Sequence, residues 1–204
     1  LVQMMRGRGS RVGYVASGPE PDFHYFNASK SYYARLGLEL AVFHDLDAPS
    51  AETETDRLLA CDVIHLSGGD TFAFLSRLRR GGMLNVLRDW ALSRGILIGV
   101  SAGSILMTPT IALDALFSGG RPQDALDGHA LDVVPFEYFP HAMSKPNYLE
   151  DLRLYSLQTS RPIIACGDGD GVVVSHGFVE CVGEPVWIRK GHFETVKDMP
   201  LDAI

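Results

Sequence analysis

A serine flanked by small residues follows an apolar run directly, in the segment Gly99-Val100-Ser101-Ala102-Gly103. Residues 95–100 are typical of a buried strand, and residues 102–107 of a helix. On a sharp strand-to-helix turn a serine hydroxyl is lifted above the sheet edge, and the helix N–H groups favour a developing oxyanion. Ser101 is therefore a candidate nucleophile, and a serine that only caps the helix is the alternative.

A second loop, Ser67-Gly68-Gly69-Asp70, also follows a predicted strand, Asp62–Leu66, and precedes a predicted helix, Thr71–Arg80. Paired glycines allow backbone N–H groups to approach a substrate carbonyl, so the loop could supply an oxyanion donor. The alternative is a tight turn in which Asp70 caps the helix.

A catalytic serine needs a histidine base, and the chain has seven histidines. His141 is the best placed, because it follows the strand-like run Val133–Phe139 and because Pro140 restricts the backbone before it. His65 lies inside a buried strand and is typical of a core histidine. His24 and His44 lie on early segments and could be surface or turn residues. His129 lies in the predicted loop region, His176 in a predicted hairpin turn, and His192 near the end of the sequence.

The orienting acid is sought in Gly167-Asp168-Gly169-Asp170-Gly171, between the predicted strands Pro162–Cys166 and Gly171–Ser175. Alternating Gly and Asp also suggests a calcium loop, but the full ligand pattern is not completed here. A bend with one functional acid is favoured, and spacing alone leaves open whether Asp168 or Asp170 has that role.

These segments resemble the dipeptidase E (aspartyl dipeptidase) and cyanophycinase family of serine peptidases. The resemblance extends from about Arg11 to Arg189. The matching segments occur in one order: Leu66-Ser67-Gly68-Gly69-Asp70-Thr71-Phe72, Gly99-Val100-Ser101-Ala102-Gly103, Phe139-Pro140-His141 and Gly167-Asp168-Gly169.

The resemblance implies a class I glutamine-amidotransferase-like fold, with Ser101 as nucleophile, His141 as general base and Asp168 in the acid position. It also implies an oxyanion hole from the Gly68-Gly69 loop and the Ala102 N–H. Asp114 is similar in placement to a family aspartate near the active site, and a plain structural acid is its alternative. The candidates for substrate binding are Asp70, Asp114 and Asp170.

The order serine, histidine, acid differs from that of the α/β-hydrolases, in which the acid precedes the histidine. Two features depart from the family. Family members usually have a strand before the one predicted at Arg11–Ala16, and here only Leu1–Met5 could supply it. The stretch Tyr148–Arg153 has one arginine, where aspartyl dipeptidases have an arginine-rich helix, so an Asp preference is not carried over.

The elements that position these residues alternate between strand and helix, which predicts βαβ units. We expect an α/β fold in one domain, residues 1–204: a mostly parallel sheet with helices on both faces and antiparallel strands near the C-terminus. Ser118–Gly128 is predicted to be a surface loop. The remaining elements are predicted as strands at Leu38–His44, Phe178–Val182 and Val186–Arg189, and as helices at Asn27–Leu36, Ala51–Ala60 and Met83–Arg94.

The composition limits the partners. A net charge of −7 argues against a nucleic-acid or anionic-membrane surface. Three cysteines without CxxC spacing predict no disulfide framework and a reducing cytoplasm. No apolar run reaches the ~20 residues of a membrane helix. We expect a short peptide as substrate and no metal or organic cofactor, and the resemblance is compatible with a homodimer.

Three alternatives are kept. The enzyme could act on a cyanophycin-like isopeptide instead of an ordinary short peptide. A non-catalytic binding protein could share the fold, because fold alone does not determine function. An amidotransferase is disfavoured, since the nucleophile position holds serine and not cysteine.

Overall fold

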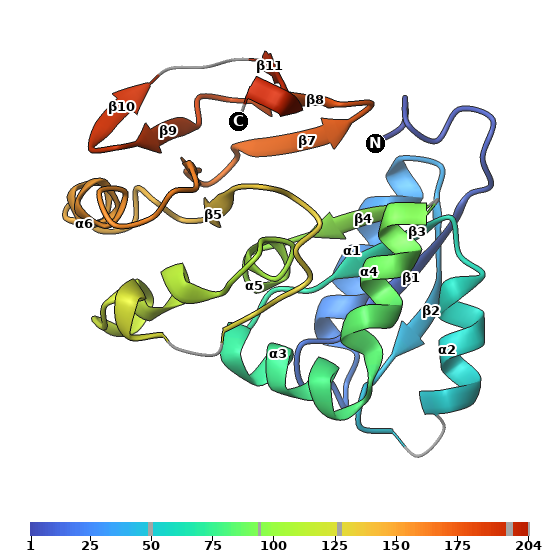
Figure 1. Cartoon of the computed structure of the whole chain (residues 1–204). Coiled ribbons are helices and arrows are strands. Elements are labelled where there is room, and N and C mark those ends of the chain that lie inside the picture. The colour runs from blue at the N-terminus through green and yellow to red at the C-terminus, as the bar shows by residue number, and fades with distance from the viewer. Residues whose placement is uncertain (49–50, 94, 126–127, 195–197, 204) are drawn as a thin grey trace. The chain divides into compact units, whose positions relative to one another are not determined.

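The computed structural model describes residues 1–48, 51–93, 95–125, 128–194 and 198–203. The chain groups into two compact units, Leu1–Gly103 and Ser104–Ile204, which are described in turn (Figure 1). One domain over residues 1–204 stays a prediction.

The first unit contains a parallel sheet with the strand order β2-β1-β3-β4. Its strands are short and apolar, and β3 is buried along its whole length, as expected for a parallel sheet with both faces covered. The α/β prediction with a parallel sheet is confirmed. The elements of this unit are β1 (Arg11–Val15), α1 (His24–Arg35), β2 (Glu39–His44), α2 (Ala51–Leu59), β3 (Val63–Leu66), α3 (Thr71–Arg80), α4 (Met83–Ser93) and β4 (Ile96–Gly99), and the first half of α5 (Ala102–Ile105).

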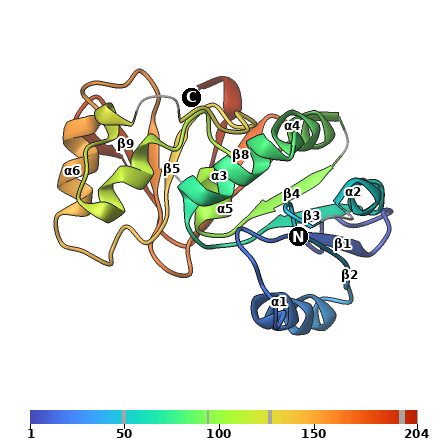
Figure 2. The same ribbon diagram turned by 90° about the horizontal axis from the view of Figure 1, so that it is seen from below.

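Helices cover both faces of this sheet, and Figure 2 shows α1 on one side of the strands and α2 and α4 on the other. Successive residues of a strand point to opposite faces. Val12 and Tyr14 pack with Tyr33 of α1, whereas a Cβ at Gly13 would meet the Leu58 side chain of α2 at 2.4 Å. The absence of a side chain at residue 13 therefore lets α2 approach the sheet.

Helix α3 begins and ends where the sequence predicts. The Asp70 carboxylate accepts a hydrogen bond from the Ala73 N–H at 2.8 Å, which caps the first turn. The Gly81 N–H donates to the Arg77 carbonyl and closes the last turn. This helix is amphipathic, and its apolar stripe includes the fully buried Phe74 and Leu78.

The second unit has two small sheets, ordered β10-β9-β6-β5 and β11-β8-β7. The pair β5–β6 is parallel, and every other pair is antiparallel, which confirms the predicted antiparallel end of the chain. Its elements are η1 (Ala112–Ser118), η2 (Pro122–Asp124), β5 (Glu137–Phe139), α6 (Tyr148–Tyr155), β6 (Ile163–Ala165), β7 (Gly171–Ser175), β8 (Phe178–Val182), β9 (Val186–Arg189), β10 (His192–Glu194), β11 (Asp198–Pro200) and η3 (Leu201–Ala203).

Some boundaries differ from the prediction. The strand expected over residues 133–139 is restricted to β5, because Val134 and Phe136 are buried against Trp187 without pairing in a sheet. Helix α1 begins three residues before the predicted start, and residues 1–5 form turns instead of a strand. The predicted loop 118–128 contains η2, and residues 126–127 lie outside the described residues, as does Arg94 of the helix predicted before β4.

The three cysteines are free thiols, and Cys61 and Cys166 are buried, as predicted for core residues. In the part of the chain that the structure describes, no helix is both long enough and apolar enough to span a membrane.

His65 is the core histidine that the sequence predicts. Its ring is 7% exposed, stacks on Tyr14, and lies 2.8 Å from the Tyr33 hydroxyl through Nδ1. Burial lowers its pKa from 6.5 to about 4. The folded protein therefore keeps this ring neutral in a pH range where the unfolded chain protonates it.

We expect this difference to destabilise the fold in mild acid. The unfolded chain binds the extra proton as the pH falls below 6.5, and the loss is complete near pH 4. Between pH 7.5 and pH 5.0 the free energy of unfolding should fall by about 2 kcal/mol from this group. Urea denaturation at both pH values checks this, with His65→Gln as the comparison. An equal fall in parent and variant would contradict the assignment.

Candidate active site

Ser101 has a left-handed backbone conformation, which residues other than glycine rarely adopt. It lies two residues after the end of β4, directly before α5, and its φ is 50°. A non-glycine residue in this left-handed region costs of order 1–3 kcal/mol and persists only where its surroundings fix it. The Gly103 N–H donates to the carbonyls of Val100 (2.9 Å) and Ser67 (3.1 Å), which ties the turn to the loop after β3. This is the strand–turn–helix geometry that the sequence predicts for a nucleophile.

The small residues around Ser101 are required by close packing. A Cβ at Gly103 would lie 2.2 Å from the Leu66 carbonyl oxygen, and Ala102 is fully buried. A Cβ at Gly68 would lie 3.3 Å from the Cβ of Ser101. The glycine-rich loop and the serine, which are more than thirty residues apart in the chain, are therefore neighbours in the first unit.

The loop Gly68–Asp70 contains a backbone conformation that glycine readily adopts and other residues do not. Gly69 has a φ of 146°, a value that side chains rarely allow, and its Cα lies against the Ser17 side chain. The Ser17 hydroxyl donates to the Gly68 carbonyl at 2.7 Å. Asp70 caps α3, as one of the two sequence interpretations stated, and its role in substrate binding stays a prediction.

His141 and Asp168 are in contact in the second unit. The His141 Nδ1 lies 2.6 Å from an Asp168 carboxylate oxygen, within hydrogen-bond distance. His141 follows β5 and Pro140, and its φ of 57° is also left-handed. The imidazole is about half exposed and the Asp168 side chain is 81% exposed, so water competes for this contact. The pair orients the ring more than it stabilises the fold.

Asp170 makes different contacts. One of its carboxylate oxygens accepts from the Gly167 N–H at 2.9 Å, and the other from the Glu184 N–H at 3.0 Å. Both oxygens therefore hold the turn that presents Asp168. These contacts favour Asp168 over Asp170 as the partner of the histidine.

Asp114 lies in the first turn of η1 and is partly buried. Of the other histidines, His176 is in the β7–β8 hairpin turn, as predicted. His44 is fully buried at the end of β2, so the expectation of a surface or turn residue was wrong there. Ser17 is the residue that sequence reasoning did not single out. Its position directly after a predicted strand, opposite a Gly-Gly loop, gives no signal in one sequence.

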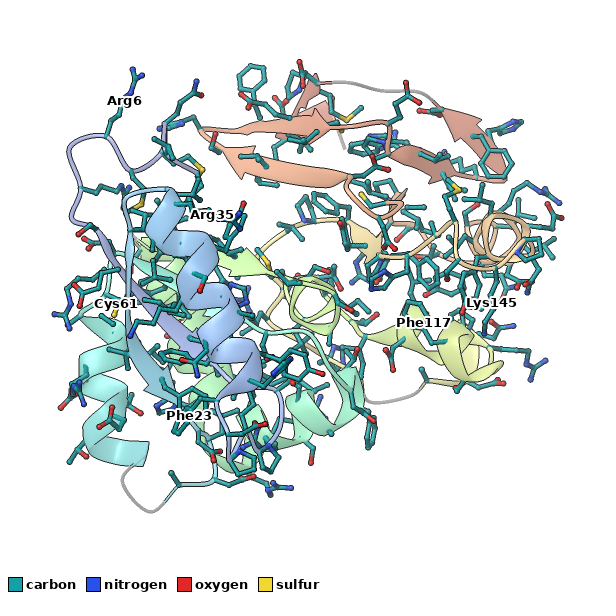
Figure 3. All side chains as sticks on the ribbon, turned by 180° about the vertical axis from the view of Figure 1, so that it is seen from behind. Arg6, Phe23, Arg35, Cys61, Phe117 and Lys145 are labelled. Atoms are coloured by element: carbon teal, nitrogen blue, oxygen red, sulfur yellow. The ribbon has the colours of Figure 1, made fainter. Side chains whose placement is uncertain are left out.

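The helix after the histidine, α6, has its one arginine already paired. The Arg153 guanidinium donates two hydrogen bonds to the Glu150 carboxylate, from Nε at 2.8 Å and from Nη2 at 2.6 Å. Lys145 lies between His141 and α6 in the chain and donates to the Phe117 carbonyl (Figure 3). Its ammonium group also lies over the Tyr148 ring. A cleft of about 540 Å³ borders this helix, with Lys145, Asn147, Tyr148, Asp151 and Tyr155 among its lining residues.

Comparison with known proteins identifies the family of the chain. The model of peptidase family S51 matches residues 1–182. The chain belongs to this family and is a serine-type peptidase, a hydrolase.

The similar proteins and solved structures are also named as peptidases. An uncharacterized peptidase of Listeria monocytogenes serovar 1/2a is 30% identical over 68% of this chain and 69% of its own. Peptidase E of Escherichia coli O6:K15:H31 is 27% identical over all of this chain and 88% of its own. A crystal structure of a candidate peptidase E from Listeria monocytogenes EGD-e has a TM-score of 0.60 at 23% identity, covering 97% of this chain and 93% of its own. A peptidase from an acI-B1 Actinobacterium has a TM-score of 0.67 at 15% identity, covering 98% and 87%. The two structures confirm the fold.

The packing at Gly103 yields a stability prediction. Gly103→Ala forces a methyl group against a backbone carbonyl that cannot rotate away, so we expect a loss of about 1–3 kcal/mol in the free energy of unfolding. Gly18→Ala is the matched control, because a Cβ there meets nothing within 4 Å, and its change should stay below about 0.5 kcal/mol. Urea denaturation measures both. Equal stability of the two variants would show that α5 does not pack on β3 in this way.

Proposed function

We propose that this peptidase hydrolyses short peptides through an acyl-enzyme on Ser101, with His141 as base and Asp168 as the acid that orients it. The observation that carries the proposal is the 2.6 Å contact of the His141 Nδ1 with Asp168. A ring held through Nδ1 presents Nε2 as the nitrogen that exchanges a proton with the serine. The left-handed turn at Ser101 supports the serine as the reacting group.

In the first half of the reaction the Ser101 oxygen attacks the peptide carbonyl carbon, and the His141 Nε2 takes the hydroxyl proton. The oxyanion accepts hydrogen bonds from the N–H groups of Gly69 and Ala102. The C–N bond then breaks, and the imidazolium gives its proton to the leaving amine.

In the second half a water molecule attacks the acyl-enzyme carbonyl and gives a proton to His141. The ester bond breaks, the proton returns to the Ser101 oxygen, and the carboxylate product leaves. Asp168 stabilises the imidazolium in both halves and keeps the ring in the required tautomer. The three side chains complete this sequence without a metal or organic cofactor.

The proposed triad predicts a graded loss of activity. Ser101→Ala and His141→Ala should each lower kcat by about 10⁶, and Asp168→Asn by about 10⁴, on the scale of the subtilisin triad. Asp170→Asn should act through folding, since its carboxylate holds a turn, and should lower the midpoint of urea unfolding instead. Hydrolysis of a dipeptide and tripeptide panel gives the rates.

Labelling with a fluorophosphonate probe tests the serine independently of substrate choice. Labelling of the parent should vanish in Ser101→Ala and fall sharply in His141→Ala. A folded parent that the probe does not label, and that cleaves no peptide of the panel, would contradict the proposed mechanism.

The pairing of Arg153 predicts a broad preference at the cleavage site. Because Glu150 occupies the arginine fork, a substrate carboxylate gains little from this helix. We expect Asp-Leu and Ala-Leu to be cleaved with kcat/KM values within about tenfold, which corresponds to about 1.4 kcal/mol. An Asp preference above a hundredfold would contradict this reading. A β-Asp-Arg isopeptide in the same panel tests the cyanophycinase-like alternative.

A further inference from the structure

Ser17, the second residue after β1, contacts three consecutive residues beside the candidate nucleophile, Ser67, Gly68 and Gly69. Its hydroxyl donates to the Gly68 carbonyl at 2.7 Å, and its own N–H donates to the Ser67 hydroxyl oxygen at 2.8 Å. A Cβ at Gly69 would lie 2.3 Å from the Ser17 hydroxyl oxygen, so the hydroxyl packs directly on the Gly69 Cα.

These contacts determine how the Gly68–Gly69 peptide group is turned. A trans peptide is planar, and its C=O and N–H point in opposite directions. Once the Gly68 carbonyl is bonded to Ser17, the Gly69 N–H must point away from Ser17. A peptide between two glycines has little steric resistance to turning over, because neither residue has a Cβ. The Ser17 hydroxyl supplies the shorter of two hydroxyl hydrogen bonds to this carbonyl, at 2.7 Å, and the Ser67 hydroxyl supplies the longer one, at 3.3 Å.

Ser17 is itself held by a buried charged group. Arg77 of α3 is 4% exposed and donates to the Ala16 carbonyl at 2.8 Å. Its other nitrogens pair with Asp45 and with Asp47, the latter at 2.7 Å. The peptide group between Ala16 and Ser17 is therefore held at both ends. Its carbonyl accepts from Arg77, and its N–H donates to Ser67.

We propose that Ser17 is a positioning residue that keeps the Gly69 N–H directed at the oxyanion. The inference rests on the proposed function, since it needs an oxyanion at this loop. Ser17 does not touch the reacting atoms. Its effect is on the transition state, in which the carbonyl oxygen gains negative charge, and only weakly on substrate binding.

Ser17→Ala tests this role. Removal of an oxyanion donor costs about 10²–10³ in kcat, and a donor that is only misdirected costs less, so we expect kcat to fall about 10- to 100-fold with KM within twofold. The inhibition constant of a peptide boronic acid should rise by a similar factor, because its tetrahedral adduct places an oxygen at the same site.

Ser31→Ala is the matched control. Ser31 also donates its hydroxyl to a backbone carbonyl, that of Asn27 at 3.2 Å, but on the exposed side of α1. It should leave kcat and the boronic acid constant unchanged. Urea denaturation of each variant accompanies the kinetics, and a fall in kcat of Ser17→Ala at an unfolding midpoint equal to that of the parent supports a positioning role.

The outcomes separate the two hypotheses. A parent whose activity does not depend on Ser101 overturns the proposed function. A parent whose activity depends on Ser101, together with a Ser17→Ala variant that keeps the parental kcat and boronic acid constant, overturns the role of Ser17 alone. A rise in KM without a fall in kcat also overturns it.

Discussion

Residue 103 has no room for a side chain, because its Cα faces the Leu66 carbonyl of the neighbouring strand. This close approach explains the other features of the turn. It brings α5 onto the end of β3, and the chain between β4 and α5 must then turn within two residues. Ser101 takes the left-handed conformation that such a turn requires. The cost of the serine backbone is offset by the packing of the residues around it.

The second unit also holds a candidate catalytic residue in a left-handed conformation, but it does so with backbone hydrogen bonds. His141 is also left-handed, and backbone hydrogen bonds hold it on its C-terminal side, from the Ala142 N–H to the Cys166 carbonyl and from the Ser144 N–H to its own carbonyl. The two acids after β6, Asp168 and Asp170, make different contacts. The Asp170 carboxylate accepts hydrogen bonds from backbone N–H groups, whereas the Asp168 carboxylate contacts the His141 imidazole. These two sets of contacts fix the conformation of the Gly-Asp-Gly-Asp-Gly segment.

The sequence predicts most of the first unit because its signals are local. Asp70 and Gly81 are strong helix boundaries, so α3 agrees with the prediction at both ends. The run before His141 was mispredicted, since burial of Val134 and Phe136 produces the same apolar pattern as strand pairing. The strands β10 and β11 have three residues each, too few for a period to be visible.

The candidate site shows the same limit. The residue types and order indicate Ser101 and His141, but the choice between Asp168 and Asp170 depends on which backbone N–H groups lie nearby, and spacing does not contain that information. The same reasoning explains why Ser17 has no sequence signal. The proposed role of its hydroxyl depends on the Gly68 carbonyl oxygen, which is 51 residues away in the chain and 2.7 Å away in the fold. Glycines give the loop its close approach to Ser101 but leave its peptide free to turn, so a neighbouring element must restore the direction. The oxyanion donor that we propose at Gly69 would therefore depend on a side chain outside the Gly-Gly motif that indicates it.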